Sequence, residues 1–365
     1  MKKKRILLLA GLSSVHTIKW ANALVDYGYD VHVVSQQTPV EKLDSRVKTY
    51  LLPNRGGVGY FLMVPFVRRL IKKIMPGVIN AHYASGYGTT ARLSGFPYLL
   101  SVWGSDVYRF PYKSKLHHYL IRKNLSSATI VASTSEAMAG QIRSITNNID
   151  CLEITPFGVD CSVFRPAEYV QNKPFIIGTV KGLKKIYGVD ILIRSFAEVL
   201  KKRPSVPLIL RIVGSGPIRL ELERLVQDLG IESSVEFIGA VVHAKVPEYL
   251  RSFSIYTALS RSESFGVAVI EASACGLPVV VSDVGGLPEV VIANQTGYIV
   301  ESENVKSTVD ALVTLIDSES KRLEMGFEGR RYVKDNYSWD LCVRKFCDIL
   351  EKQYEIQKKA LIKYK

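Results

Sequence analysis

The sequence is poor in cysteine and contains no long hydrophobic run. Its five cysteines, an odd number without the spacing of a disulfide or metal framework, favour reduced thiols in a cytosol. No apolar run reaches the roughly 20 residues that cross a bilayer. The basic start followed by residues 6–10 resembles a signal peptide, but the apolar run is too short and an amphipathic segment follows it. We therefore expect residues 6–10 to form the first strand of a cytoplasmic protein.

Acidic residues are also scarce relative to basic ones. The chain has 34 Asp and Glu against 48 Lys and Arg, a formal net charge of +14. Such a charge attracts acidic partners, namely nucleic acid, anionic lipid or phosphorylated substrates. No recognised nucleic-acid-binding module is present, so we expect no nucleic acid partner. The charge alone does not choose between lipid and phosphorylated substrates.

A complete dinucleotide-binding fingerprint is missing as well. Residues 11–16, which follow the first expected strand, lack its glycine spacing. Residues 213–217 contain two of the glycines, but Arg219 stands where the third belongs. These departures argue against a nicotinamide-dependent oxidoreductase.

What the sequence does contain is a regular alternation of short apolar runs and helical patterns. With 365 residues, 47% of them hydrophobic, the chain is long enough for two cores. The alternation predicts two parallel α/β sheets with crossover helices. Expected strands are 6–10, 31–35, 78–81, 98–102, 129–132 and 152–154, then 175–178, 208–213, 235–238, 255–258, 279–282 and 298–300. The expected domains are 1–160, joined by a long helix over 339–365, and 173–338, with a hinge from 155 to 173.

The most informative segment is 262–272, which holds two glutamates with seven residues between them. It lies between an expected strand and a helix that Gly276 and Pro278 close. A helix N-terminus in this setting holds anions, and Gly266 lets a ligand approach the backbone. Glu263 is expected in the loop and Glu271 inside the helix, each meeting a different part of a phosphorylated, polyhydroxylated ligand. The alternative is one capping and one solvated glutamate, although Glu271 has apolar neighbours and needs a partner when buried.

With these motifs, the chain resembles the retaining glycosyltransferases of family 4, which have the GT-B fold. The likeness covers nearly the whole chain and is most specific over 175–300. There 214–217, 235–239, 246–250 and the two-glutamate segment occur in the family's order. The resemblance implies two Rossmann-like domains facing a central cleft, with the nucleotide-sugar in the C-terminal domain and the acceptor in the N-terminal one. It also implies that the C-terminal helix crosses back to the first domain.

On the donor side, the resemblance implies that Glu271 holds the ribose and that Glu263 meets the sugar's hydroxyls. Lys181 stands near the family's diphosphate-binding arginine, but Ile186 occupies the place of the second cation, which Lys184 or Lys185 replaces. The alternative for these lysines is a solvated surface loop. The donor-binding residues implied are Lys181, Lys185, Gly11, Ala240, Val241, Phe265, Gly266, Val267 and Glu271.

On the acceptor side, the segment 101–107 matches a family loop with one departure. Trp103 stands where many members have a histidine, which leaves Asp106 and the backbone at this loop. His82 ends another expected strand, where open α/β sheets place ligands. His16 either reaches the cleft or merely caps a helix. The catalytic residues implied are Glu263, Asp106 and His16, and the acceptor-side residues are His82 and Trp103.

The reaction implied is transfer of a hexose or N-acetylhexosamine to a hydroxyl of a growing, lipid-linked surface glycan such as lipopolysaccharide or capsule. A UDP-sugar is favoured as donor, with GDP-mannose as the alternative. No cofactor is expected, and no metal, because no Asp-x-Asp pair follows a strand in the expected setting. Competing hypotheses are a sugar-nucleotide epimerase or phosphorylase on the same fold, and a non-catalytic nucleotide-sugar-binding subunit.

A final expectation concerns anionic membrane. Apolar residues repeat at helical spacing over 63–74, and Arg68, Arg69, Lys72 and Lys73 occupy the other side. One hypothesis is that these basic residues, with 2–5 and 358–365, dock the acceptor domain peripherally on the cytosolic face of the membrane. The alternative is an ordinary crossover helix whose basic face is solvated.

Overall fold

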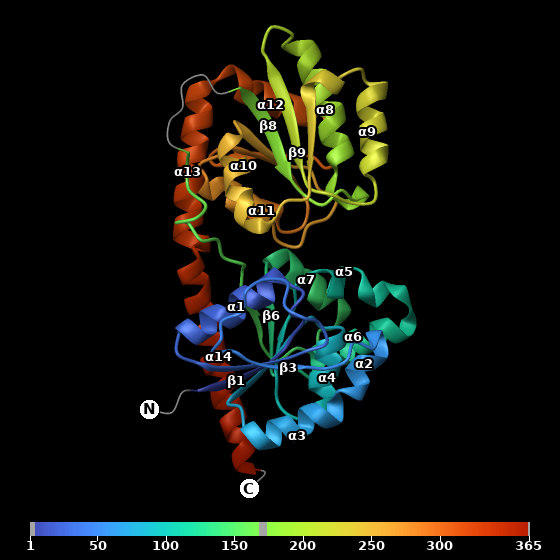
Figure 1. Cartoon of the computed structure of the whole chain (residues 1–365), viewed down its shortest axis with the longest axis vertical. Helices are drawn as coiled ribbons and strands as arrows, with labels where there is room; N and C mark the ends of the chain where they lie inside the picture. Colours follow the sequence, from blue (N-terminus) through green and yellow to red (C-terminus); the bar gives the residue numbers. More distant parts are fainter. Residues whose placement is uncertain (1–3, 168–173, 364–365) are drawn as a thin grey trace. The chain divides into compact units, whose positions relative to one another are not determined.

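The computed structural model describes residues 4–167 and 174–363, and it divides the chain into two compact units. The first unit comprises Met1–Pro156 and Cys342–Lys365, and the second comprises Phe157–Leu341 (Figure 1). Part of the expected hinge, residues 168–173, lies outside the described residues. Each unit is built around one parallel sheet.

The first unit contains a seven-stranded parallel sheet in the order β3-β2-β1-β4-β5-β6-β7. Its strands are β1 (Arg5–Leu9), β2 (Asp30–Ser35), β3 (Lys48–Leu51), β4 (Val78–His82), β5 (Leu99–Ser101), β6 (Ile130–Ser133) and β7 (Leu152–Ile154). β3 was not among the expected strands. It pairs only with β2, and three of its four residues are exposed, so it lacks the apolar run that marks the central strands.

Helices connect these strands and cover the sheet. They are α1 (Val15–Asp26), α2 (Gly56–Leu62), α3 (Val64–Ile74), α4 (Gly86–Ser94), α5 (Ser105–Tyr108), α6 (Lys115–Ser126) and α7 (Glu136–Ile145), with a 3-10 turn η1 (Phe110–Lys113). The apolar stripe of α3 is buried in the core of this unit, including Val67, Leu70 and Ile71. The packing of that stripe is therefore that of a crossover helix.

The last helix, α14 (Trp339–Lys363), returns to the first unit. Tyr29 donates a hydrogen bond to the Glu351 carboxylate at 3.0 Å, and the Gln357 amide donates to the Pro76 carbonyl at 3.0 Å. Both glutamines that α14 presents here, Gln353 and Gln357, are buried. The expected return of the C-terminal helix is confirmed.

The second unit contains a six-stranded parallel sheet in the order β10-β9-β8-β11-β12-β13. Its strands are β8 (Phe175–Val180), β9 (Leu208–Val213), β10 (Val235–Gly239), β11 (Ile255–Ala258), β12 (Val279–Ser282) and β13 (Gly297–Val300). Its helices are α8 (Val189–Lys202), α9 (Arg219–Asp228), α10 (Val246–Ser252), α11 (Val267–Ala274), α12 (Val305–Asp317) and α13 (Glu319–Tyr337). Shorter 3-10 turns are η2 (Lys185–Tyr187), η3 (Glu232–Ser234), η4 (His243–Lys245) and η5 (Leu287–Glu289). Every expected strand is therefore present in one of the two sheets.

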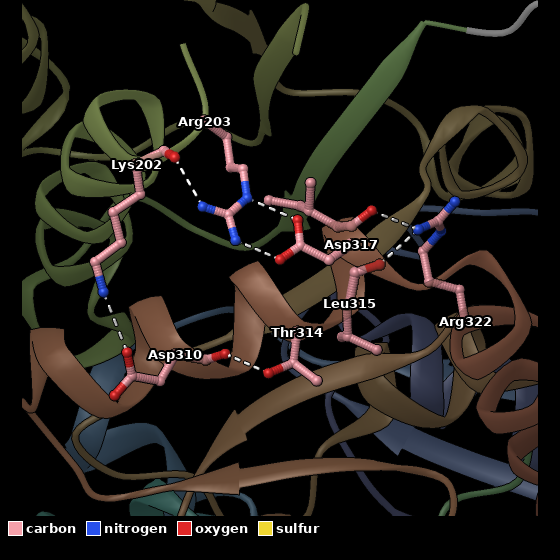
Figure 2. A network of polar contacts seen from close by, with 8 residues as sticks. Lys202, Arg203, Asp310, Thr314, Leu315, Asp317 and Arg322 are labelled. Carbon is pink, nitrogen blue, oxygen red and sulfur yellow. Dashed lines mark hydrogen bonds and ion pairs between the residues drawn. The ribbon is translucent and has the colours of Figure 1, made fainter. Parts of the chain in front are cut away.

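Polar contacts join α8 to α12 at the surface of the second unit (Figure 2). Arg203 donates to the Asp317 carboxylate at 2.7 Å, and Lys202 donates to Asp310 at 3.3 Å. Arg322 of α13 donates to the carbonyl of Leu315 at 2.5 Å. Because solvent screens these exposed pairs, the apolar face that both helices bury contributes more to their packing.

In both sheets the strand order reverses beside the first strand of the unit. The reversal lies between β1 and β4 in the first sheet and between β8 and β11 in the second. Open α/β sheets bind ligands outside the carboxyl ends of the strands at this point. The loops after β1, β4, β8 and β11 are therefore the places to examine. Within the described residues, no helix has both the length and the apolar character required to cross a membrane.

Candidate functional site

The loops that follow β8 and β11 meet in an ion pair at the reversal point of the second sheet. The Lys181 ammonium binds the Glu263 carboxylate, and only 10% and 15% of the two side chains are exposed. Burial opposes the charged ammonium, but the Glu263 carboxylate outweighs this effect and raises the pKa of Lys181. The ring of Tyr187 lies 5.1 Å from the same ammonium. Lys181 therefore stays charged and holds one expected site residue, Glu263, in a defined position.

Two glycines allow the Glu263 loop to fold tightly. Gly285 has φ +53°, and a Cβ there would lie 1.8 Å from the Glu263 carbonyl oxygen. Gly266, the residue before α11, has φ +112°, a conformation that side chains rarely adopt. At the start of α11, the first backbone amide that donates a hydrogen bond within the helix is that of Val269, whose acceptor is the Gly266 carbonyl at 2.9 Å. The amides of Val267 and Ala268 precede it at the positive end of the helix dipole.

Phe265 contributes to this loop only through its backbone. Its side chain is 2% exposed and packs against Phe157 and Tyr337, with ring centroids 6.2 and 5.6 Å away. A donor-binding role for Phe265, as expected from the sequence, is thus limited to its main chain.

The second expected glutamate has a partner that the sequence did not suggest. Glu271 is 6% exposed, and its Oε1 lies 2.8 Å from Nε2 of His243. The His243 ring lies 5.6 Å from the ring of Phe164. His243 belongs to η4, which follows β10 closely. The only available signal was a histidine four residues after Gly239, the glycine that ends β10.

The expected base-binding turn lies at the carboxyl end of β10. Gly239 has φ +88°, Ala240 is exposed, and Val241 is half-buried. The Gly239 carbonyl accepts a hydrogen bond from Gly214 at 2.8 Å, which fixes the turn beside the end of β9. Because His243 follows this turn and binds Glu271, the turn and the α11 carboxylate belong to one connected surface.

Lys185 lies in a different environment from Lys181. Its side chain is 77% exposed, and its ammonium lies 3.6 Å from the Glu221 carboxylate. The structure thus pairs Lys181, and not Lys185, with Glu263. Of the two expected diphosphate lysines, only Lys181 lies beside an expected donor residue.

Replacing Lys181 with methionine is expected to weaken binding of a nucleoside diphosphate far more than binding of the nucleoside, because contacts between ammonium and phosphate are charge-assisted. The exposed Lys185→Met variant is the matched control and should change neither affinity by more than about twofold, the range of an exposed ion pair. Isothermal titration calorimetry with both ligands measures the four affinities. Equal weakening of nucleoside and nucleoside diphosphate in Lys181→Met would contradict a phosphate contact.

In the first unit, the ends of β4 and β5 place His82 against Trp103. The two ring centroids are 4.5 Å apart, and His82 is 1% exposed. Burial lowers the pKa of His82 to about 3, so its imidazole is neutral at pH 7. Its Nδ1 is among the buried polar atoms of the described residues that have no hydrogen-bond partner. The buried His82 ring therefore packs against the half-buried Trp103.

Trp103 also contacts the other expected residues at this edge. The His16 ring lies 6.1 Å away in an edge-on arrangement, and Tyr83 lies 5.3 Å away with a strained φ of +70°. His16 is in the first turn of α1, just after the loop at Gly11. A Cβ at Gly11 would lie 2.9 Å from the Gln37 amide oxygen, so the backbone there is closely packed. The structure thus brings Gly11, His16, His82 and Trp103 to one edge of the first sheet.

Asp106, which the resemblance implied to be catalytic, is buried and bonded to the backbone of neighbouring loops. It is 2% exposed and accepts hydrogen bonds from the backbone amides of Ala84 at 2.7 Å and Gly104 at 2.9 Å. A longer bond comes from the Trp103 amide at 3.3 Å. Burial raises the pKa of Asp106, and these amide bonds oppose that rise without cancelling it. Both oxygens of Asp106 thus accept backbone hydrogen bonds, which order the Trp103 loop.

No group of three or more His, Cys, Asp or Glu side chains is arranged to hold a metal ion within residues 4–167 and 174–363. The positive charge at the candidate site comes from Lys181 and from the N-terminus of α11. Chemically, the second unit offers the buried Glu271 carboxylate, the part-buried pair of Lys181 and Glu263, and the first amides of α11 to an anionic, polyhydroxylated ligand.

Two protein-family models match this chain. A family model described as "Glycosyl transferases group 1" matches residues 163–362, and one described as "Glycosyl transferase 4-like" matches residues 5–135. The resemblance seen in the sequence is therefore confirmed for both halves of the chain.

Individual relatives agree with the family models. The chain is 28% identical over 247 residues to a GDP-mannose-dependent alpha-(1-6)-phosphatidylinositol monomannoside mannosyltransferase of Mycobacterium tuberculosis, covering 63% of this chain and 64% of that protein. It is 30% identical over 210 residues to a D-inositol 3-phosphate glycosyltransferase of Pseudarthrobacter chlorophenolicus, covering 55% of this chain and 50% of that protein. The chain thus spans less than two thirds of the length of these relatives.

Solved structures share the fold at low identity. A sucrose-phosphate synthase of Thermosynechococcus elongatus superposes with a TM-score of 0.82 at 20% identity, covering 97% of this chain and all (100%) of that one. Anabaena HepE, solved in complex with UDP, gives a TM-score of 0.80 at 17% identity, and the match covers 96% of this chain and 100% of that one. With two parallel-sheet units and a returning C-terminal helix, these matches confirm the expected GT-B fold. Because the group 1 model alone covers more than half of the sequence, this chain belongs to the family of glycosyl transferases group 1.

Proposed function

We propose that this protein is a retaining glycosyltransferase that moves a hexose or N-acetylhexosamine from a nucleotide-sugar to a hydroxyl of a lipid-linked surface glycan. The observation that carries this proposal is the pair of carboxylates at one edge of the second sheet, the part-buried Glu263 held by Lys181 and the buried Glu271 held by His243. Family membership and the names of the relatives, which describe glycosyl transfer, support it.

The roles follow from these contacts. Glu271 accepts hydrogen bonds from the ribose hydroxyls, and the turn at Ala240 and Val241 contacts the base through its backbone. Lys181 and the amides of Val267 and Ala268 attract the diphosphate, since a cation and a helix N-terminus both favour negative charge. Glu263 meets the hydroxyls of the transferred sugar, where positive charge develops in the transition state.

In the first unit, Trp103 and His16 form the acceptor side, ordered by Asp106 and His82.

In the reaction the acceptor hydroxyl oxygen bonds to the anomeric carbon, and the bond from that carbon to the phosphate oxygen breaks. The hydroxyl proton passes to the leaving phosphate, and the acceptor attacks from the same face. The protein then contributes positioning and electrostatic stabilisation, and Glu263 forms no covalent bond to the sugar.

The experiment that tests the function is a panel of UDP-sugars and GDP-mannose with the purified chain. GDP-mannose is tested on the same footing as the UDP-sugars, because the Mycobacterium tuberculosis relative is named as GDP-mannose-dependent. A donor at 100 times its dissociation constant adds about 2.7 kcal/mol to the free energy of unfolding, which thermal unfolding detects. Transfer predicts release of nucleoside diphosphate together with a glycosylated acceptor. An altered sugar nucleotide indicates an epimerase, and binding without turnover indicates a non-catalytic subunit.

Full activity is expected in the presence of a chelator, since Lys181 and a helix N-terminus supply the positive charge that the diphosphate requires. The measurement compares turnover in EDTA with turnover after addition of Mg²⁺ or Mn²⁺. A strict dependence on either ion contradicts metal-independent transfer.

We also propose peripheral contact with anionic membrane through the exposed basic side of α3. Arg69, Lys72 and Lys73 are exposed there, and the neighbouring helix α2 exposes Phe61 and Leu62 to 47% and 54%. Other parts of the expected basic surface are already engaged. Lys4 pairs with Glu351, and Arg5 pairs with Asp30. Residues 1–3 and the last two residues lie outside the described residues, as do the side chains of 360–363.

Co-sedimentation with anionic vesicles at low salt is expected to be lost in the triple variant Arg69→Gln, Lys72→Gln, Lys73→Gln. Each basic residue near an anionic surface contributes about 1 kcal/mol, so the three together change the partition coefficient by about 100-fold. The matched control replaces Arg194, Arg224 and Lys306, which are exposed in the second unit, with glutamine. An equal loss in both triple variants, or binding that ignores salt, leaves α3 as a crossover helix only.

A further inference from the structure

A pocket in the first unit takes no part in the proposed transfer. It has a volume of about 420 Å³ and lies where the C-terminal ends of α6 and α7 come together. Its lining includes Arg122, Lys123 and Ser126 from α6, and Arg143 from α7, together with Thr146 and Asn148 just beyond it. Both helices appear in the first unit in Figure 1.

The pocket carries positive charge that the negative C-terminal ends of α6 and α7 offset only in part. Its lining contains three exposed cations and no carboxylate. Lys123 lies 5.7 Å from the centroid of the Tyr119 ring, and the described residues contain no ion pair to any of the three. The sequence from 107 to 135 has no Asp or Glu, although it has five basic residues. Glu153, on the neighbouring strand β7, is already paired with Lys352 at 2.6 Å. Water screens these exposed charges from one another, and together they give the concavity a positive potential that attracts an anionic ligand.

Hydrogen-bonding groups accompany the charges. The hydroxyls of Ser126 and Thr146 lie 3.0 Å apart, and the Asn148 amide donates to the Thr146 hydroxyl at 3.2 Å. These contacts join the end of α6 to the segment after α7 and hold the wall of the pocket in place. Ile145 is the single apolar residue of the lining, so the ligand must itself be hydrophilic.

The position of the pocket separates it from the proposed active site. α6 ends at Ser126, shortly before β6 begins at Ile130, and α7 ends at Ile145, shortly before β7 begins at Leu152. The pocket therefore lies toward the edge where these parallel strands start. The loops that carry Gly11, His82 and Trp103 lie at the opposite edge, where the strands end.

We propose that this pocket binds the phosphate of a phosphorylated sugar or polyol, as a second ligand site separate from the transfer site. Two guanidinium groups match phosphate oxygens with pairs of N–H donors, and the lysine adds a point charge. The hydroxyl and amide groups of Ser126, Thr146 and Asn148 suit the hydroxyls of the ligand. The phosphate belongs either to a soluble sugar phosphate or to the headgroup of a lipid.

The test uses the full chain with saturating nucleoside diphosphate, so that the transfer site is occupied. Glucose 6-phosphate is titrated by calorimetry at low and physiological salt, with glucose as the uncharged probe, and vesicles containing phosphatidylinositol phosphate supply the lipid arm. The variant is Arg122→Gln, Lys123→Gln, Arg143→Gln. Its matched control is the triple glutamine variant at Arg194, Arg224 and Lys306, which removes the same charge elsewhere.

The expected result is binding of glucose 6-phosphate or of the vesicles, but not of glucose, and at least a tenfold loss in the pocket variant alone. Binding of the soluble probe assigns the site to sugar phosphates, and binding of the vesicles alone assigns it to a lipid headgroup. The Arg122→Lys and Arg143→Lys replacements keep the charge but lose the paired N–H donors, so they should bind more weakly than wild type and more tightly than the glutamine variant. The proposal is overturned if neither probe binds the wild type, or if the control variant loses as much affinity. Because the readout is binding, this result is independent of whether the chain transfers sugar.

Discussion

Replacing Glu263 with glutamine is expected to lower turnover by about 10²- to 10³-fold, the range seen when one electrostatic contact with developing charge is removed. Nucleoside diphosphate should still bind, because the carboxylate is assigned to the sugar. The reason is that positive charge on the sugar grows in the transition state, where an ionised carboxylate stabilises it more than an amide does. Steady-state turnover and calorimetric nucleotide affinity, measured on the same preparation, check the two halves of this result.

The Glu263 variant needs a stability control, because the structure ties this carboxylate to Lys181. Removing one partner of a fully buried ion pair costs about 3–5 kcal/mol, and this part-buried pair should cost less, since water reaches the charge that is left unpaired. The double variant Lys181→Met, Glu263→Gln removes both charges and is expected to recover most of the lost stability while turnover stays low. If turnover recovers together with the melting temperature, Glu263 acts only through folding. Wild-type turnover in a folded Glu263→Gln variant excludes the sugar contact outright.

Glu271→Ala is expected to weaken nucleoside diphosphate binding by about 10- to 100-fold, because hydrogen bonds to charged groups contribute about 1.5–3 kcal/mol. If Glu271 binds the ribose hydroxyls, a more specific result is expected. Wild type should prefer the ribonucleoside diphosphate over its 2′,3′-dideoxy analogue, and Glu271→Ala should bind the two equally weakly. Calorimetry with both ligands measures that preference. A preference that survives the loss of Glu271 shows that another group holds the ribose.

His243 provides an internal check on the Glu271 prediction. Its Nε2 lies 2.8 Å from Glu271, so His243→Ala should reduce the ribose preference by releasing the carboxylate. His243→Gln, whose amide nitrogen can reach a similar place, is expected to restore part of it. An unchanged preference in His243→Ala limits the histidine to filling space beside Phe164.

Much of the fold could be predicted from local pattern alone. The central strands are apolar runs bounded by turn residues, and a helix must follow each one to connect parallel strands. The exposed edge strand β3 has no such run, and its pairing with β2 depends on a neighbour rather than on its own residues. The loop and helix that carry Glu263 and Glu271 were also expected, because glycines and helix-closing residues mark them locally.

Other features depended on contacts between distant segments. Lys181 and Glu263 are 82 residues apart, and Glu271 meets His243 across 28 residues, so no spacing pattern pairs them. The sequence suggested a catalytic Asp106 and an acceptor-side His82, but it did not show that Asp106 accepts backbone hydrogen bonds or that burial leaves His82 neutral.

By itself, the sequence determined the parallel α/β architecture, the family and the two-glutamate segment, since each depends on residue order and short-range periodicity. Tertiary structure decided which charged side chains are neutralised, which are buried and which remain open to a ligand. The physical reason is that solvation and ion pairing depend on distances between side chains, and only the folded chain sets those distances.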